Sequence, residues 1–159
     1  PIVTRLGIAA VREAFAASGS GQRLSDAQAA WISVLLMAMP VRYYAWQLTG
    51  DSDDHGRLWT DLTRRARPDL AAGPACLLAY HAMLRGNGGL ANVALQRALD
   101  SDPDYSMVQL LRGAINTGLP LDVLRAALAH GVDDDPYPSG TEQPVNDADG
   151  HTSPDQGRP

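Results

Sequence analysis

Lysine is absent from this chain of 159 residues, and all 13 of its basic residues are arginine. The formal net charge of −5 is unevenly spread, because residues up to Val132 hold 12 arginines against 11 acids, whereas the rest holds seven acids against Arg158. Binding to a phosphate backbone requires a clustered positive surface. A body of balanced charge therefore argues against a nucleic-acid partner. The arginine-only, alanine-rich composition is typical of GC-rich genomes.

Cysteine is nearly absent, since Cys76 is the single one. It cannot form an internal disulfide, which is typical of a reducing compartment and predicts a cytoplasmic protein. His81 lies five residues further on, about 140° around a helix, so it is badly placed to act as a base for the thiol. We expect Cys76 to be a buried structural residue.

Long apolar runs are also missing. The mostly apolar stretch near the middle, residues 29–41, is interrupted by Pro40, whereas a helix that crosses a bilayer needs about 20 apolar residues. At the N-terminus, Arg5, Arg12 and Glu13 interrupt any apolar region, so it does not resemble a signal peptide. We expect no membrane segment, and the missing initiator methionine suggests a fragment of a longer protein.

Alternating β-strand patterns are absent as well, so we predict an all-α fold. Apolar residues recur at helical spacing from about residue 4 to residue 130. We predict a stack of antiparallel helical hairpins with six to seven helices, in a domain over residues 1–131. The residues expected at its core are Trp31, Leu35, Leu77, Leu95 and Leu110. Residues 132–159 are acidic and rich in proline and glycine, and we predict that this tail is disordered.

Ser25 and Gln28 form a capping-box pattern, which predicts a helix that starts at Asp26. This helix is apolar on nearly every side, so we interpret it as the central buried helix of the domain. Pro40 is expected to stop or kink it.

Residues 74–104 contain the clearest motif, two amphipathic helices joined by a glycine-rich turn and ended by Pro103. The spacing of small and apolar residues resembles one tetratricopeptide repeat. The positions that carry this resemblance are Ala79, Ala91, Leu95, Ala98 and Pro103. The pattern does not recur one period later, so we predict one tetratricopeptide-like hairpin and no array.

Several motifs in the same order resemble the C-terminal region of an uncharacterised actinobacterial family, the domain of unknown function 4192. The resemblance covers roughly residues 23–120, and it implies lineage and a cytoplasmic setting but no catalytic residue. Tyr43 and Tyr44 stand where the family tends to have aspartates, and the α/β-like N-terminal region of long members is not visible here. The motifs are the segment around Trp59 and the stretches 75–79, 86–88, 90–95 and 102–107.

Residues 51–56 mimic the opening of a calcium-binding loop, with Asp51, Asp53, His55 and Gly56 at suitable positions. The twelfth position holds Leu62, where a bidentate glutamate is required. We therefore predict a solvated polar loop that leads into a helix, and no metal or cofactor. The histidines without ligand spacing, expected to face solvent, are His55, His130 and His151.

Two groups of residues are candidates for a partner surface. Tyr43, Tyr44 and Trp46 cannot all face inward on one short helix, and exposed aromatic residues are typical of binding surfaces. A groove bordered by arginines is the second candidate, because arginine can orient a partner. These arginines are Arg57, Arg64 and Arg65.

No catalytic constellation accompanies these residues, so we predict a non-catalytic interaction or scaffold module with a protein partner rather than an enzyme. Self-association is left open. One alternative is an accessory helical domain of a larger enzyme whose catalytic domain is missing here. Another is a regulatory protein weakly associated with nucleic acid.

Overall fold

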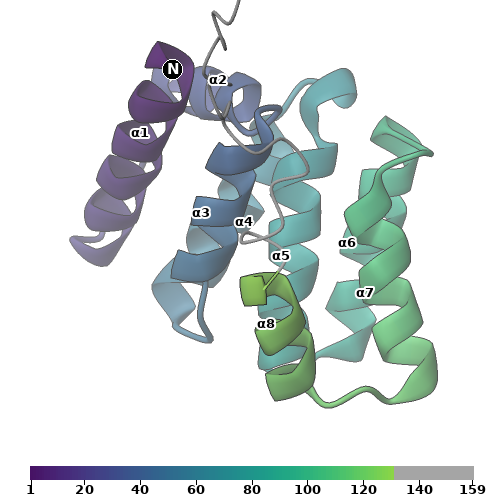
Figure 1. Ribbon diagram of the computed structural model, residues 1–159. Coiled ribbons are helices and arrows are strands. Elements are labelled where there is room, and N and C mark those ends of the chain that lie inside the picture. Colours follow the sequence, from purple (N-terminus) through teal and green to yellow (C-terminus); the bar gives the residue numbers. More distant parts are fainter. Residues whose placement is uncertain (131–159) are drawn as a thin grey trace, which may run out of the picture.

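The computed structural model describes residues 1–130, which form eight α-helices and one 3-10 turn and contain no β-strand (Figure 1). The predicted all-α fold is confirmed. The predicted disorder of residues 132–159 and the domain end at residue 131 lie outside the described residues. The elements are α1 (Ile2–Gly19), α2 (Asp26–Leu35), α3 (Met39–Leu48), α4 (Asp53–Arg65), η1 (Pro68–Leu70), α5 (Ala72–Leu84), α6 (Gly88–Ser101), α7 (Ser106–Thr117) and α8 (Leu121–His130).

The count of eight helices within residues 1–130 exceeds the six to seven that we predicted. Pro40 lies in the first turn of α3. A proline there gives up only an amide that has no partner in the helix. Pro40 therefore opens the short helix that carries Tyr43, Tyr44 and Trp46.

Helix α5 lies at the centre of the domain, with α3 and α4 on one side and α6 and α7 on the other (Figure 1). Ten of its 13 residues are buried, from Ala72 at its start to Ala82 near its end. A helix that is apolar on all sides must be surrounded by protein. This position belongs to α5, so our interpretation of the helix at Asp26 as the central one was wrong.

Small side chains let α5 and α6 pack closely as an antiparallel hairpin. Ala75 and Ala79 on α5, and Ala91 and Ala98 on α6, are all fully buried. The turn between the helices uses Gly86 at φ +70°, a left-handed conformation that glycine adopts without strain. At the open end of the hairpin, the Ala72 amide donates to Ser101 Oγ at 3.1 Å.

Helix α1 packs against α3 and α4. Gly7 on α1 lies directly against the side chain of Val41, at the start of α3. Near the other end of α1, Ser18 Oγ donates to the Asp54 carbonyl oxygen at 2.7 Å. These two contacts hold α1 near both of its ends. The contact of Gly7 with Val41 places the start of α1 next to the start of α3.

Helix α2 lies at one end of the domain and contacts α1 and α4 (Figure 1). Because it is covered on one side only, Trp31 is 51% exposed, which contradicts its predicted place in the core. Leu110 is also exposed, since α7 faces the core through Val108, Leu111 and Ala114. The other three predicted core residues, Leu35, Leu77 and Leu95, are buried.

The predicted capping box is present, with the Gln28 amide donating to Ser25 Oγ at 3.2 Å and the Ser25 amide donating to Gln28 Oε1 at 2.9 Å. The predicted polar loop at residues 51–56 is wrong in part. Ser52 caps α4, and Asp53 and Asp54 lie in its first turn, where acidic side chains favour the positive end of the helix dipole. None of the helices in residues 1–130 is long and apolar enough to cross a membrane.

The contact between Gly7 and Val41 predicts a large difference between two glycine substitutions. A Cβ atom at position 7 would lie 2.3 Å from a methyl group of the Val41 side chain, which is fully buried. We expect Gly7→Ala to lower the free energy of unfolding by about 1 to 3 kcal/mol. Urea denaturation followed by circular dichroism measures this change.

Gly113→Ala is the matched control, because Gly113 lies inside α7 with open space around its Cβ position. We expect it to raise the free energy of unfolding by about 0.5 to 1 kcal/mol, since alanine favours a helix over glycine. Equal effects of the two substitutions would contradict the close packing of α1 on α3.

Candidate binding surfaces

The structure does not bring Tyr43, Tyr44 and Trp46 together on one exposed face. Trp46 is 4% exposed and packs in the core against Tyr80, with ring centroids 4.5 Å apart. Tyr44 turns toward α1, where Arg12 Nε donates to its hydroxyl group at 3.3 Å. Tyr43 turns away from it and lines a pocket with Trp46. Tyr43 and Trp46 are three residues apart and share one face of α3, whereas the adjacent Tyr44 lies on another face.

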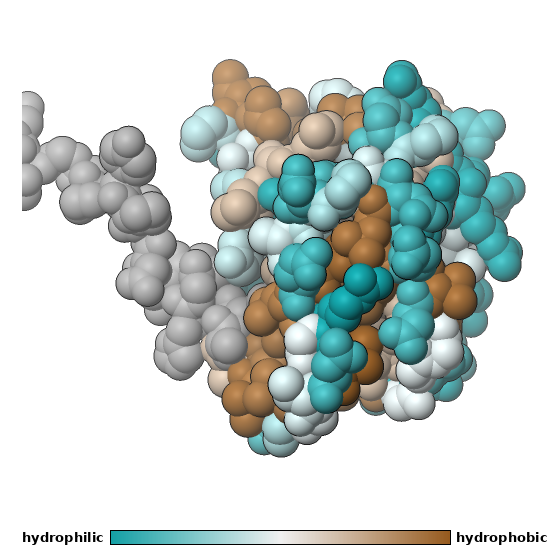
Figure 2. Space-filling view, turned by 90° about the vertical axis from the view of Figure 1, so that its right-hand side faces the viewer, coloured by the Kyte–Doolittle hydropathy of each residue, from teal (hydrophilic) through white to brown (hydrophobic). Residues whose placement is uncertain are grey.

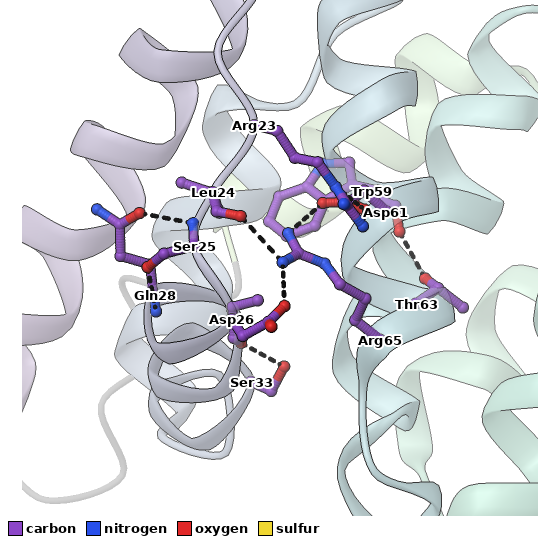
Figure 3. Close-up of polar contacts among 11 residues, drawn as sticks. Arg23, Leu24, Ser25, Asp26, Gln28, Ser33, Trp59, Asp61, Thr63 and Arg65 are labelled. Carbon is purple, nitrogen blue, oxygen red and sulfur yellow. Dashed lines mark hydrogen bonds and ion pairs between the residues drawn. The ribbon is translucent and has the colours of Figure 1, made fainter.

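The three candidate arginines differ in what they contact. Arg57 is exposed and forms an ion pair with Asp54, one turn earlier on α4. Arg64 is exposed. The side chain of Arg65 is only 15% exposed, because it turns inward to the segment that leads into α2 (Figure 3).

Arg65 holds this segment against α4. Its Nη1 atom donates to the Leu24 carbonyl oxygen at 2.9 Å and to Asp26 Oδ1 at 3.1 Å, while its Nη2 atom pairs with Asp61 (Figure 3). Arg23 pairs with the same Asp61 carboxylate at 3.1 Å. The guanidinium of Arg65 is thus engaged within the fold, which leaves Arg57 and Arg64 as the candidate arginines exposed to a partner.

A pocket of about 260 Å³ lies between the C-terminal half of α3, the middle of α5 and α8. We call it the aromatic pocket, because three aromatic side chains contribute to its wall. Trp46 and Tyr80 belong to its buried part, and Arg125 of α8 stands at its exposed side. Its lining residues are Tyr43, Trp46, Gln47, Leu48, Thr49, Gly50, Tyr80 and Arg125.

Arg125 is held at the aromatic pocket by Tyr80. Its Nε atom donates to the Tyr80 hydroxyl group at 3.1 Å, across 45 residues of sequence. None of the ion pairs within residues 1–130 involves Arg125. The guanidinium therefore keeps N–H groups that are not engaged by an acid of the described chain.

A second group of exposed residues was missed by our choice of candidate surface. Large apolar side chains are exposed at the start of α1, on α2 and from there to the start of α3, and α1 contacts both α2 and α3. Figure 2 shows hydrophobic residues at the upper left of the molecule, and in Figure 1 the upper end is the one at which α1 begins and α2 lies. We call this group the α1–α2 patch: Ile2, Val3, Leu6, Trp31, Val34, Met37 and Met39.

The sequence did carry a signal for this patch. The helix at Asp26 is apolar on nearly all sides, and we attributed this to burial. A helix at the end of a bundle can bury only one side. Apolar residues on its other side, such as Trp31 at 51% exposed, then indicate a surface that contacts another molecule.

Cys76 is fully buried in α5, as the sequence predicts. Burial raises the pKa of its thiol well above the ordinary value. The thiol therefore stays protonated at neutral pH, and a protonated thiol is a poor nucleophile. The described residues contain no group of three or more histidine, cysteine or acidic side chains that could hold a metal ion.

Two histidines hold the peptide groups of Gly50 between α3 and α4. The Gly50 amide donates to His55 Nδ1 at 2.8 Å, and His81 Nδ1 lies 2.8 Å from the Gly50 carbonyl oxygen. A carbonyl oxygen only accepts, so His81 Nδ1 carries the proton in this contact. Gly56 makes room for His81, since a Cβ atom at Gly56 would lie 2.5 Å from His81 Nε2.

The prediction that His55 faces solvent is wrong. Its ring is half-buried and meets the edge of Phe15, with ring centroids 4.8 Å apart. Burial lowers the pKa of His55, and the nearby His81 lowers it further. Protonation would also turn Nδ1 into a donor and remove the acceptor of the Gly50 amide. The side chains of His130 and His151 lie outside the described part of the chain.

The lowered pKa of His55 predicts how stability depends on pH. Above the unfolded-state value of 6.5 the ring is neutral in both states, so its contribution to stability is complete. As the pH falls from 6.5 through the lower folded-state pKa, the unfolded chain takes up the proton first and this contribution is lost. We expect the free energy of unfolding to fall less between pH 7 and pH 5 in His55→Gln than in the parent protein.

Urea denaturation at a series of pH values measures this difference. The glutamine side chain supplies an oxygen acceptor for the Gly50 amide but does not titrate, so the comparison isolates protonation at residue 55. Parallel curves of stability against pH for the two proteins would show that His55 does not titrate differently in the folded state.

Comparison with known proteins identifies the family. A family model described as a domain of unknown function (DUF4192) matches residues 2–121. No curated protein matches the chain, and neither does any solved structure. The match begins at residue 2, earlier than the resemblance that we noted from residue 23, so all of α1 shares the pattern of the family. The chain belongs to the DUF4192 family.

Proposed function

We propose that this domain is a non-catalytic helical interaction module and that the α1–α2 patch is its partner surface. The observation that carries the proposal is the exposure of Trp31, Met37 and Met39, at 51%, 65% and 56%, within residues 31–39 at one end of the domain. Contiguous exposed apolar side chains on a folded domain are typical of a surface that binds a partner.

The residue types in the α1–α2 patch favour binding to protein. Tryptophan is enriched among the residues that contribute most to protein–protein affinity, because its large ring fills a pocket on the partner. Methionine is flexible and polarisable, so Met37 and Met39 can adapt to the shape of an apolar partner surface. We expect Trp31 to be the anchor and the two methionines to surround it.

The interior of the domain also supports a binding role over a catalytic one. Its polar groups are engaged in holding the fold: Arg65 binds the segment before α2, and His55 and His81 hold Gly50. Cys76 is buried and protonated. A rigid body with its reactive groups occupied in this way suits a scaffold whose contacts are made at its surface.

The module acts in the cytoplasm in this proposal, where a lone thiol such as Cys76 stays reduced. The α5–α6 hairpin serves as a tetratricopeptide-like element that keeps the core rigid. The absence of lysine fits a GC-rich source such as an actinobacterium.

Capture of partners from the source cell tests this proposal. The test variant combines Trp31→Gln, Met37→Gln and Met39→Gln. We expect it to recover the partner at about one tenth of the parent amount or less, because loss of an interface anchor weakens binding by about 2 kcal/mol or more. Mass spectrometry with isotope labels measures the recovered amounts.

Val93→Gln serves as the control, since Val93 is 68% exposed but lies on α6, away from the α1–α2 patch. Both variants should keep the thermal stability of the parent, because their substitutions are at exposed positions. Partner recovery that is unchanged by the triple substitution, or equally reduced by Val93→Gln, would exclude the α1–α2 patch as the partner surface.

A further inference from the structure

We propose that the aromatic pocket binds a small flat molecule that carries an apolar ring and a carboxylate. The pocket combines two features that such a ligand needs. Trp46 and Tyr80 supply an aromatic wall, and Arg125 supplies a cation at the exposed side. This site is separate from the α1–α2 patch, so the proposal does not depend on the proposed partner surface.

The charge of the aromatic pocket favours an anion. Arg125 is the one charged residue among its eight lining residues, and no acid lines it. Asp51 and Asp122 border a neighbouring hollow that Arg125 also reaches, but neither forms an ion pair with it. Because Tyr80 engages only Nε of the guanidinium, the outer N–H groups can donate to both oxygens of a carboxylate.

The wall of the pocket favours a flat apolar group. Trp46 and Tyr80 are almost completely buried, and their rings are tilted by 51° with centroids 4.5 Å apart. Together with Leu48 they offer an apolar surface whose shape is fixed by the core. The volume of about 260 Å³ is slightly below the usual range of ligand pockets, about 300 to 1,000 Å³, so it suits a small ligand of one or two rings.

Most polar groups of the pocket wall are already satisfied. Thr49 Oγ1 donates to the Ala45 carbonyl oxygen at 2.8 Å and accepts from Trp59 Nε1 at 2.9 Å. The Gly50 amide is held by His55. Arg125, with Tyr43 and Gln47 on the same face of α3, is therefore left to recognise a polar group of the ligand.

Binding of three aromatic carboxylates and their neutral amides tests the proposal on the full chain. The probes are benzoate, 2-naphthoate and indole-3-carboxylate, each beside the corresponding carboxamide of the same shape. Nuclear magnetic resonance follows the indole N–H signal of Trp46, assigned with Trp46→Phe. We expect at least one carboxylate to bind saturably and at least about tenfold more tightly than its amide, because the ion pair is lost in the amide.

Substitutions locate the site. Arg125→Gln should remove the preference for the carboxylate, and Arg125→Lys should retain part of it, since lysine keeps the charge but not the planar fork. Arg67→Gln is the control, because Arg67 is exposed and pairs with Asp69. It should bind the probes as the parent does. Circular dichroism confirms that each variant folds.

Three results would overturn the proposal. The first is the absence of saturable binding by all three carboxylates at millimolar concentration. The second is equal affinity for each carboxylate and its amide. The third is a folded Arg125→Gln protein that keeps the parent preference for the carboxylate.

Discussion

The burial of α5 on every side is the constraint on which the rest of the structure depends. A helix can be surrounded at close range only where its side chains are small, because protein interiors are packed without large voids. Ala75 and Ala79 meet this condition and let α6 approach, while Tyr80 packs against Trp46 of α3. The helices around α5 are placed by the parts of its surface that they bury.

Residues of α5 help to position each of the two candidate sites. Gly73, near its start, lies against Leu36, and this contact sets the end of α2 close to the bundle. Tyr80 reaches the aromatic pocket and holds Arg125, and the next residue, His81, turns to Gly50. One buried helix thus determines the geometry of two surface regions and of the connection between α3 and α4.

Features that depend on neighbours in sequence could be predicted. The capping box of Ser25 and Gln28, which starts α2, is one example. The α5–α6 hairpin was visible because its small residues and its glycine turn lie within about 30 residues. Local chemistry selects these structures whatever the rest of the chain does.

Features that depend on the position of a helix within the bundle could not be predicted. The composition of α2 is equally compatible with a central helix and with one at the end of a bundle, so Trp31 was misplaced. Trp46 turns inward because Tyr80 from α5 stacks against it, a contact between segments far apart in sequence. His55 appeared to lie in a solvated loop, but the start of α4 packs against Phe15 of α1.

The central role of α5 is tested most directly by native-state hydrogen exchange, which measures the free energy of opening at each backbone amide. If α5 is the central helix, the amides of Leu77, Ala79 and His81 exchange only when the whole domain unfolds. Their exchange free energies then equal the global free energy of unfolding, while those in the first turns of α1 and α2 are lower. Exchange from α5 at the rate of α2, or through a local opening that leaves the other helices protected, would contradict this organisation.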